Sequence, residues 1–534
     1  MQNIAGVLCV LILLSGARAQ SRSCEGLGQL ALPQARVVSA DAIAAGAFSP
    51  PAGRTPGPAA TASIFKTLPA FCRIVVQGRP SADSDIKIEV WMPSSGWDGR
   101  FHGQGNGGFA GEIDYRGMAV ALSRGSATAG TDTGHSGSAI DATWALGHPE
   151  KVIDFGYRAI HQMTQVAKAA AAAFYGTKSF HSYFGSCSNG GRQALMEAQR
   201  FADDYDGILA GAPANFWTHL LAGGLWDAQA TTNDPASYIP ASKVPAIATA
   251  VNAACDAQDG VADGILNDPR LCHFDAATML CKNGDSEQCL TAPQVTALNK
   301  LYQGAHDKSG QIFPGFVPGA EEGEGGWSTW ITGATPGRGL LFAFTNGFFS
   351  DIVYDKADWN YKTADLTGAT RAGDSKTASI LNAVNPDLRP FRDRGGKLIL
   401  YHGWDDPAIS ALNTIDYYDA VVRQIGEQNA KSFLRLYMLP GVQHCGGGPG
   451  PSPFSVQGGR APHDPQHDVQ LALETWVEKG AAPSEIVATK YASADPASEV
   501  KMTRPLCAYP QTARYKGSGD PNQAENFTCS LPRK

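Results

Sequence analysis

Short apolar segments separated by glycine-rich turns dominate the first part of the chain. Three of these segments have the length and composition of strands: residues 85–93, 100–108 and 119–134. An alanine-rich segment with helical apolar spacing follows at residues 152–176, and its last residue is a glycine, which commonly ends a helix. Residues 179–201 then predict a strand, a turn and a second helix. Because strands and helices alternate, we expect a parallel sheet with helices on its faces.

The regular alternation stops in the middle third of the chain. Residues 214–385 are rich in glycine, asparagine, aspartate and aromatic side chains, without a sustained period. The pattern then predicts three further elements: a strand and turn at 395–407, a helix at 413–426, and a strand that enters a glycine-rich loop at 432–445. We therefore expect an inserted lid domain at 214–385, within a core domain formed by residues 20–213 and 386–534.

The first residues predict export. Residues 1–19 contain a short apolar run that ends in Ala17-Arg18-Ala19, which is typical of a signal peptide cleaved after Ala19. A membrane anchor is the alternative, but the run is short for a bilayer span. No other long apolar run occurs in the sequence, so we expect a protein that is secreted or periplasmic and has no membrane partner.

The composition and net charge narrow the class of protein further. The chain has 534 residues and is 43% hydrophobic, which suffices for a large core and for more than one domain. Its formal net charge is -7, so we expect no basic surface and no nucleic-acid partner.

Cysteine usage agrees with an oxidising compartment. Eleven cysteines occur, and Cys9 lies in the expected signal peptide, so the other cysteines can form five disulfides. Short separations, or a place near the mature N-terminus, suggest four pairs: Cys24 with Cys72, Cys255 with Cys272, Cys281 with Cys289, and Cys507 with Cys529. Cys187 and Cys445 remain, and they form either the fifth disulfide or two buried thiols.

Three polar residues follow three predicted strands. Ser188 follows one strand, Asp405 or Asp406 the next, and His444 the last, which is the chain order of an α/β-hydrolase. Each residue alone has an ordinary explanation: a serine in a turn, a solvated aspartate, a histidine in a loop. Together they predict an α/β-hydrolase core in which Ser188 is the nucleophile, His444 the base, and the aspartate holds the imidazole.

A disulfide between Cys187 and Cys445 would join the loops of the expected nucleophile and base. In the chain-entropy model, closing a loop of this length contributes about 4 to 5 kcal/mol to stability. The bond would also hold Ser188 and His444 close together before a substrate binds.

Four motifs together resemble the tannase and feruloyl esterase family, which includes mono(2-hydroxyethyl) terephthalate hydrolase: SCSNGG at 186–191, HGWDDP at 402–407, HCGGG at 444–448, and residues 503–520. The resemblance implies a secreted serine carboxylesterase with a lid, and a disulfide between the serine and histidine loops. It implies as substrates small esters of aromatic acids of the feruloyl, galloyl or terephthaloyl type. It also selects Asp406 over Asp405 as the acid.

Such an ester hydrolase needs donors for the oxyanion that forms during the reaction. The backbone amide of Asn189, which follows the nucleophile, is one candidate, and Gly107 or Gly108 in the glycine-rich loop is the second. A plain glycine-rich turn is the competing explanation for that loop.

A second group of acidic residues lies between Cys255 and Cys272. Asp256, Asp259 and Asp263 can offer carboxylates, and Val261 and Ile265 can offer carbonyl oxygens, to one hard cation. A solvated acidic turn is the alternative. We expect a structural calcium ion, which the resemblance also implies, and no organic cofactor.

The substrate pocket is the part that the sequence defines least. Residues 327–349 are aromatic-rich and can wall an aromatic acyl group, and the resemblance places Trp330 at a substrate-facing position. Ile409 stands where mono(2-hydroxyethyl) terephthalate hydrolase has phenylalanine, and Asn189 where it has glutamate. Arg338 is the nearest candidate for binding a free carboxylate. The alternatives are therefore a terephthalate monoester hydrolase, or, from another class, a calcium-dependent binding protein. We expect a monomer or a dimer.

Overall fold

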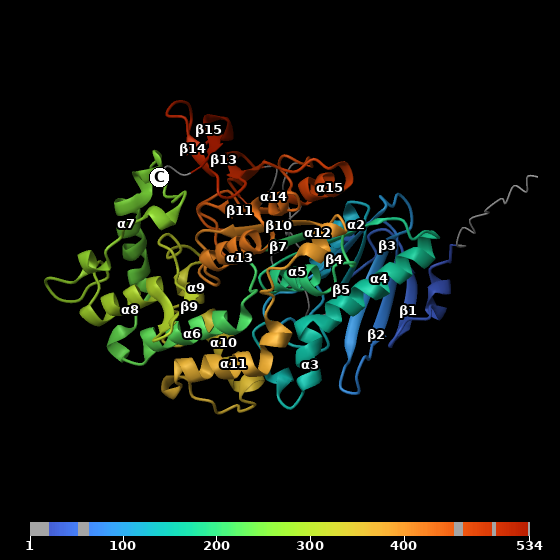
Figure 1. Ribbon diagram of the computed structural model, residues 1–534, viewed down its shortest axis with the longest axis horizontal. Coiled ribbons are helices and arrows are strands. Elements are labelled where there is room, and N and C mark those ends of the chain that lie inside the picture. Colours follow the sequence, from blue (N-terminus) through green and yellow to red (C-terminus); the bar gives the residue numbers. More distant parts are fainter. Residues whose placement is uncertain (1–20, 52–63, 453–462, 494–497, 532–534) are drawn as a thin grey trace, which may run out of the picture.

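The computed structural model describes residues 21–51, 64–452, 463–493 and 498–531. The expected signal peptide and Cys9 lie outside the described residues. Within the described residues, a nine-stranded sheet organises the molecule (Figure 1), with the strand order β1-β2-β3-β5-β4-β6-β7-β10-β11. The strands are β1 Ala35–Ile43, β2 Phe71–Gly78, β3 Ile86–Pro93, β4 Arg100–Gln104, β5 Ala127–Thr131, β6 His181–Cys187, β7 Gly207–Gly211, β10 Lys397–Gly403 and β11 Leu434–Leu439.

The sheet is parallel only in part. Strands β5, β4, β6, β7, β10 and β11 pair in parallel, as the alternating pattern predicts. Strands β1, β2 and β3 extend the sheet with antiparallel pairs. Strands β1 and β2 are absent from the sequence prediction. In β1 no residue is fully buried, so this edge strand lacks the apolar run that marks a central strand.

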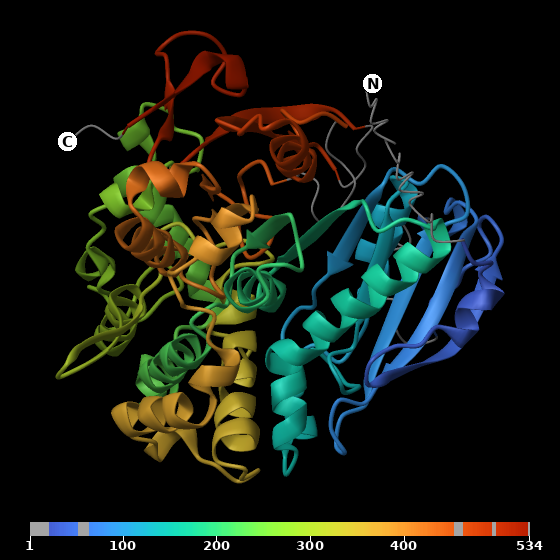
Figure 2. The ribbon, with the colours of Figure 1, turned by 45° about the vertical axis from the view of Figure 1, so that its right-hand side comes forward.

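Helices cover both faces of the sheet. On one face, Phe184, Ile208 and Leu398 share a core with α4 Ala159–Tyr175, α5 Asn189–Arg200 and α13 Ala411–Ile425. The neighbouring positions in the same strands, such as Leu209 and Ile399, point to the other face and pack with α15 Val469–Lys479. Figure 2 shows α4 running along its face of the sheet. This mixed sheet with helices on both sides is the α/β-hydrolase type that the sequence predicts.

The strand predicted at residues 119–134 is only partly confirmed. Residues 119–123 belong to a helix, α2 Tyr115–Ser123, and only β5 forms from the segment 119–134. Asp114 caps this helix by accepting a hydrogen bond from the backbone amide of Gly117, and Met118 and Leu122 are buried one helical turn apart. The cap and this spacing outweigh the short apolar run that suggested a strand.

The predicted helix at 152–176 is confirmed, with a more complex start. It begins as α3 Pro149–Ile153, passes through one π-helical turn at Asp154–Arg158, and continues as α4. It ends at Gly176, whose positive φ of 68° is the left-handed conformation expected of a glycine stop.

The segment between β7 and β10 is mostly helical and lies on the opposite side of the molecule from β1 and β2 (Figure 1). It contains a small hairpin of β8 Gly304–Asp307 and β9 Gly310–Pro314. Its α-helices are α6 Trp217–Thr232, α7 Val244–Cys255, α8 Ala292–Gln303, α9 Trp327–Trp330, α10 Leu340–Gly347 and α11 Leu366–Leu381. The boundaries of a lid domain at 214–385 stay a prediction.

The remaining elements complete the core and the C-terminal part. Two short helices, α12 Arg389–Asp393 and α14 Glu427–Lys431, flank β10 and β11. The C-terminal residues form two hairpins from β12 Glu485–Tyr491, β13 Val500–Cys507, β14 Thr512–Tyr515 and β15 Phe527–Ser530.

The structure contains five disulfides, and their pairing is the one expected from the sequence. Four are local, with sequence separations of 48 residues or fewer. The fifth joins Cys187 to Cys445 across 258 residues. It therefore connects the C-terminal end of β6 to the loop that follows β11.

Candidate functional site

Ser188 occupies a sharp turn between β6 and α5. Its φ is 66° and its ψ is -125°, a conformation that a residue with a side chain rarely adopts. The surrounding backbone holds it: its amide donates to the carbonyl of Gly211 at 3.0 Å, and its carbonyl accepts from the amide of Ala214 at 3.1 Å. A Cβ at Gly190 would overlap the side chain of Ser186, so the turn needs glycine there. The hydroxyl of Ser188 is thereby exposed to the space above the sheet.

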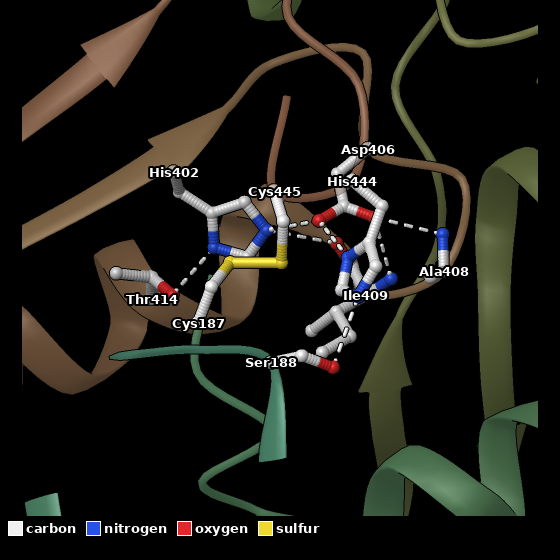
Figure 3. Close-up of a disulfide and its surroundings, with 9 residues drawn as sticks. All are labelled: Cys187, Ser188, His402, Asp406, Ala408, Ile409, Thr414, His444 and Cys445. Carbon is white, nitrogen blue, oxygen red and sulfur yellow. Dashed lines mark hydrogen bonds and ion pairs between the residues drawn. A yellow bond between two sulfur atoms is a disulfide. The ribbon is translucent and has the colours of Figure 1, made fainter. Parts of the chain in front are cut away.

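Three side chains from three strand ends meet at this turn (Figure 3). Nε2 of His444 lies 2.9 Å from Oγ of Ser188, and Nδ1 of the same ring lies 2.8 Å from Oδ2 of Asp406. His444 lies in the loop after β11, and Asp406 in the turn after β10. The structure thus brings together the three residues that the sequence singled out, in the order serine, imidazole, carboxylate.

Asp406 is fully buried, and hydrogen bonds hold both of its oxygens. Oδ1 accepts from the backbone amides of Ala408 at 2.8 Å and Ile409 at 3.0 Å, while Oδ2 faces the rings of His444 and His402. Burial by itself would raise the pKa of this carboxyl. The charge of His444 and the hydrogen bonds from His402 and His444 outweigh burial, so the pKa of Asp406 lies well below its usual range.

The neighbouring aspartate has a different environment. Asp405 is also buried, but it faces Gly319 and Glu321 of the segment between β7 and β10. Burial and the charge of Glu321 raise the pKa of Asp405 well above its usual value. Asp406 is therefore the aspartate of this pair that contacts His444, as the resemblance implied.

The disulfide between Cys187 and Cys445 lies directly beside the three side chains (Figure 3). Each cysteine adjoins one of these residues in sequence, because Cys187 precedes Ser188 and Cys445 follows His444. Cys445 has a positive φ of 61°, and Ser188, the residue after Cys187, also has a positive φ, so the backbone departs from ordinary geometry near both ends of the bond.

A cleft of about 490 Å³ opens above Ser188. Its lining includes Gly107 and Gly108, the two glycines expected to provide a second oxyanion donor. Gly108 has a φ of +54°, and a Cβ there would overlap the carbonyl of Ala139, so this position also needs glycine. The side chain of the buried Asn189 donates to the carbonyl of Asn106 at 3.3 Å, which ties the serine turn to the glycine loop.

Aromatic rings from the inserted segment form one wall of the cleft. Trp330 of α9 packs edge-on against the ring of His444, with 4.9 Å between the ring centroids, and its other neighbour is Phe344 of α10. The expected position of Trp330 at the cleft agrees with this placement. Phe344 is a lining residue that the sequence analysis did not single out, although it belongs to the aromatic segment 327–349.

Two residues expected to bind substrate do not line this cleft. Arg338 is exposed in the turn between α9 and α10. Ile409 is buried, and its described hydrogen bonds run through its backbone, to Asp406 and to His402. Among the described residues, Arg116 is the arginine that does line the cleft, and it is solvent-exposed.

The acidic loop between Cys255 and Cys272 is closed by the expected disulfide. Asp256 accepts from the amide of Gly264, Asp259 from the amide of Val261, and Asp263 from that of Ile265. Burial raises the pKa of Asp259 to about 6, and the charges of Asp263 and Asp256 add to this effect. The donor set is all oxygen and its carboxylates repel one another, which fits a hard cation. Their oxygens are not gathered within 4.8 Å of one another, however.

Buried groups behind the serine turn were not predicted. Arg192 of α5 is fully buried, donates to the side chain of Asn189 at 2.8 Å, and binds backbone carbonyls of Phe155 and Gly156. His402 contacts Asp406 from the other side. Both residues belong to the quoted motifs or lie one residue beyond them, but a motif does not reveal which neighbours a side chain contacts.

Comparisons with known proteins agree with this geometry. Residues 72–530 match the family model for tannase and feruloyl esterase. The chain is 42% identical to an uncharacterized esterase of Xanthomonas campestris, over 97% of this chain and 92% of that protein. It is 34% identical to mono(2-hydroxyethyl) terephthalate hydrolase of Piscinibacter sakaiensis, over 89% of this chain and 87% of that protein.

A solved structure shares the architecture. The crystal structure of feruloyl esterase B from Aspergillus oryzae superposes with a TM-score of 0.86 at 31% identity, covering 95% of this chain and 99% of that one. Among the described residues, every helix is too short or too polar to cross a membrane. The chain belongs to the tannase and feruloyl esterase family of carboxylic ester hydrolases.

Proposed function

We propose that this protein is an exported serine carboxylesterase that hydrolyses esters of aromatic carboxylic acids. One observation carries the proposal. Ser188, His444 and Asp406 form a continuous hydrogen-bonded chain, and Ser188 and His444 line a cleft with an aromatic wall. Family membership and five disulfides support the reaction class and the oxidising compartment.

In the proposed reaction, Oγ of Ser188 attacks the ester carbonyl carbon while Nε2 of His444 takes the hydroxyl proton. The carbonyl oxygen becomes negative and is held by backbone amides, for which Asn189 and Gly107 or Gly108 are the candidates. The imidazolium returns its proton to the departing alcohol, which leaves the acyl group on Ser188. A water molecule then attacks this acyl-enzyme by the same route and releases the acid. Asp406 stays ionised throughout and stabilises the imidazolium.

The cleft favours an uncharged aromatic acyl group. Trp330 and Phe344 supply flat apolar walls close to His444. Feruloyl and galloyl esters fit such walls. A terephthalate monoester would also need a cation for its free carboxylate. Arg338 lies outside the cleft, and Arg116, which lines it, is solvent-exposed, so that an ion pair with it would contribute little. We therefore rank feruloyl-type and galloyl-type esters above terephthalate monoesters.

We also propose that the loop of Asp256, Asp259 and Asp263 holds a structural calcium ion, with the carbonyls of Val261 and Ile265 in its shell. The oxygen-only donors and the raised pKa of Asp259 support this assignment. The ion would stabilise the loop and take no part in the reaction.

A hydrolysis panel tests the proposed activity. Methyl ferulate, methyl gallate and mono(2-hydroxyethyl) terephthalate are each incubated with the protein and with Ser188→Ala. We expect the methyl esters to turn over faster, and Ser188→Ala to lose at least about a thousandfold in kcat. An active-site phosphonate should label Ser188. Turnover that survives Ser188→Ala would refute the mechanism, and a chain that neither hydrolyses an ester nor reacts with the phosphonate would be a binding protein instead.

A further inference from the structure

His402 is a buried histidine that the proposed reaction does not use. It lies near the end of β10, four residues before Asp406, and its side chain has no solvent exposure. Its ring is placed between Asp406 and helix α13 (Figure 3). Nε2 lies 3.1 Å from Oδ2 of Asp406 and 3.0 Å from the carbonyl of Ile409, while Nδ1 lies 2.7 Å from Oγ1 of Thr414.

The partners of the ring define where its proton lies. Both neighbours of Nε2 are acceptors, a carboxylate and a carbonyl, so Nε2 carries a proton and donates it to them. On the other side of the ring, the hydroxyl of Thr414 can donate to Nδ1 or accept from it. The ring is thereby held from both sides.

This arrangement gives Oδ2 of Asp406 two imidazole donors. One is Nδ1 of His444 at 2.8 Å, and the other is Nε2 of His402. The two backbone amides on Oδ1 fix one end of the carboxylate, and His402 fixes the rotation of the other end toward His444. A second donor also makes Oδ2 less basic, so the proton taken from Ser188 stays on His444 and does not move to Asp406.

We propose that His402 is a positioning residue that holds Asp406 in the orientation and charge state that His444 requires. The inference rests on the proposed function, because it concerns the same chain of hydrogen bonds. If His402 only filled space in the core, a replacement of similar size would keep kcat whether or not it could donate to Asp406. If His402 positions Asp406, only a replacement that can donate will keep kcat, so an experiment can separate the two roles.

Two substitutions at His402 test whether the residue donates a hydrogen bond to Asp406 or only fills space. His402→Gln places an amide N–H near the position of Nε2, so it can still donate to Asp406. His402→Asn carries its amide near the position of Nδ1, so it keeps a partner for Thr414 but cannot reach Asp406. We expect His402→Gln to keep kcat within about threefold of wild type, and His402→Asn to lose about 10- to 100-fold in kcat, with little change in KM. Methyl ferulate, or the fastest ester of the panel, serves as substrate.

Thr414→Val provides a variant that keeps His402 and the side-chain volume. It removes the hydroxyl that holds Nδ1, so the ring loses one of the two contacts that orient it, and we expect kcat to fall by about 2- to 10-fold. Thermal unfolding is measured for every variant to verify that each one folds. Wild-type kcat in a folded His402→Asn variant, or equal losses in the Gln and Asn variants, would overturn the inference; if His402→Asn does not fold, wild-type kcat in Thr414→Val would do so.

A double-mutant cycle distinguishes failure of this inference from failure of the proposed function. In an Asp406→Asn background, His402→Asn should cause no further loss of the residual rate, because His402 acts through Asp406. A full additional loss would show that it acts elsewhere. If Asp406→Asn itself keeps wild-type activity, the proposed function fails. If Asp406→Asn is inactive while folded His402→Asn is fully active, only the role of His402 fails.

Discussion

At the scale of single residues, the site concentrates backbone strain and buried charge. Ser188 and Cys445 both have positive φ values, and a non-glycine residue in such a conformation costs on the order of 1–3 kcal/mol. Neighbouring contacts offset this cost: backbone hydrogen bonds hold Ser188, and a disulfide holds Cys445. The strained turn points the hydroxyl of Ser188 away from the backbone and toward His444, whose Nε2 forms a hydrogen bond with it.

The lowered pKa of Asp406 predicts a specific dependence of stability on pH. A carboxyl with a depressed folded-state pKa stabilises the fold above its unfolded pKa of about 3.9, and this contribution is lost as the pH falls toward the folded value. Asp406→Asn removes the titration. We therefore expect the difference in Tm between wild type and Asp406→Asn to be constant from about pH 8 to pH 5 and to shrink below about pH 4.

Differential scanning calorimetry over this pH range measures the effect. Asp405→Asn is the matched control. Burial and the charge of Glu321 raise the pKa of Asp405, so its replacement should relieve a cost at neutral pH and give the opposite trend. A wild-type advantage over Asp406→Asn that already disappears between pH 7 and pH 5 would contradict the ionised state assigned to Asp406.

At the scale of secondary-structure elements, the turns after β6, β10 and β11 create the site. These strands pair in parallel through β7, so their carboxyl ends meet at one edge of the sheet. This geometry explains why Ser188, Asp406 and His444 could be predicted from the sequence: each follows a short, buried apolar run. The start of α2 could not be predicted in this way, because its signal is the cap at Asp114 and not the apolar pattern.

The disulfide between Cys187 and Cys445 joins two of these turns, and its removal should affect both stability and rate. The chain-entropy model gives about 5 kcal/mol for this loop and about 2.5 kcal/mol for the short loop between Cys281 and Cys289. We expect Cys187→Ala with Cys445→Ala to lower Tm and also kcat, because Ser188 and His444 lose their link. Cys281→Ala with Cys289→Ala, in the inserted segment and outside the lining of the cleft, should lower Tm only.

Calorimetry and ester kinetics on the two double variants check this prediction. Both variants remove one disulfide and two sulfur atoms, so they differ mainly in which loops they release. An unchanged kcat in the Cys187 and Cys445 variant would mean that the backbone alone positions the serine and the imidazole.

At the scale of the whole molecule, the inserted segment adds an aromatic wall to the cleft, and here the sequence was least informative. Trp330 was placed at the cleft through the family resemblance, whereas Arg338, from the same aromatic-rich segment, proved to be exposed. Side chains in this segment face the cleft or the solvent according to how α9 and α10 pack on the core, and no period of two or 3.6 residues encodes that choice. Strand β1 was missed because it is a half-exposed edge.

The acidic loop connects three distant parts of the molecule. Asp263 forms an ion pair with Arg504 of β13, and the side chain of Asn267 donates to the carbonyl of Ala513 in β14. Ile265 packs near Gly441, three residues before His444. A cation at this loop would therefore stabilise the inserted segment, the C-terminal hairpins and the approach to the histidine loop together.

Removal of calcium should consequently destabilise the whole protein. A ligand present at a hundredfold excess over its Kd stabilises the folded state by about 2.7 kcal/mol, which corresponds to roughly 2–3 °C in Tm for a chain of this length. We expect Tm to fall by this amount in excess chelator, to recover with calcium and to recover less with magnesium, which needs stricter octahedral geometry. Asp259→Asn should lower Tm in calcium and abolish the response to chelator, whereas Asp275→Asn, an exposed helix cap in the same segment, should keep that response. If wild-type Tm is the same in calcium and in chelator, the loop is a hydrogen-bonded acidic turn without an ion, and its disulfide and its contact with Arg504 suffice to join these parts.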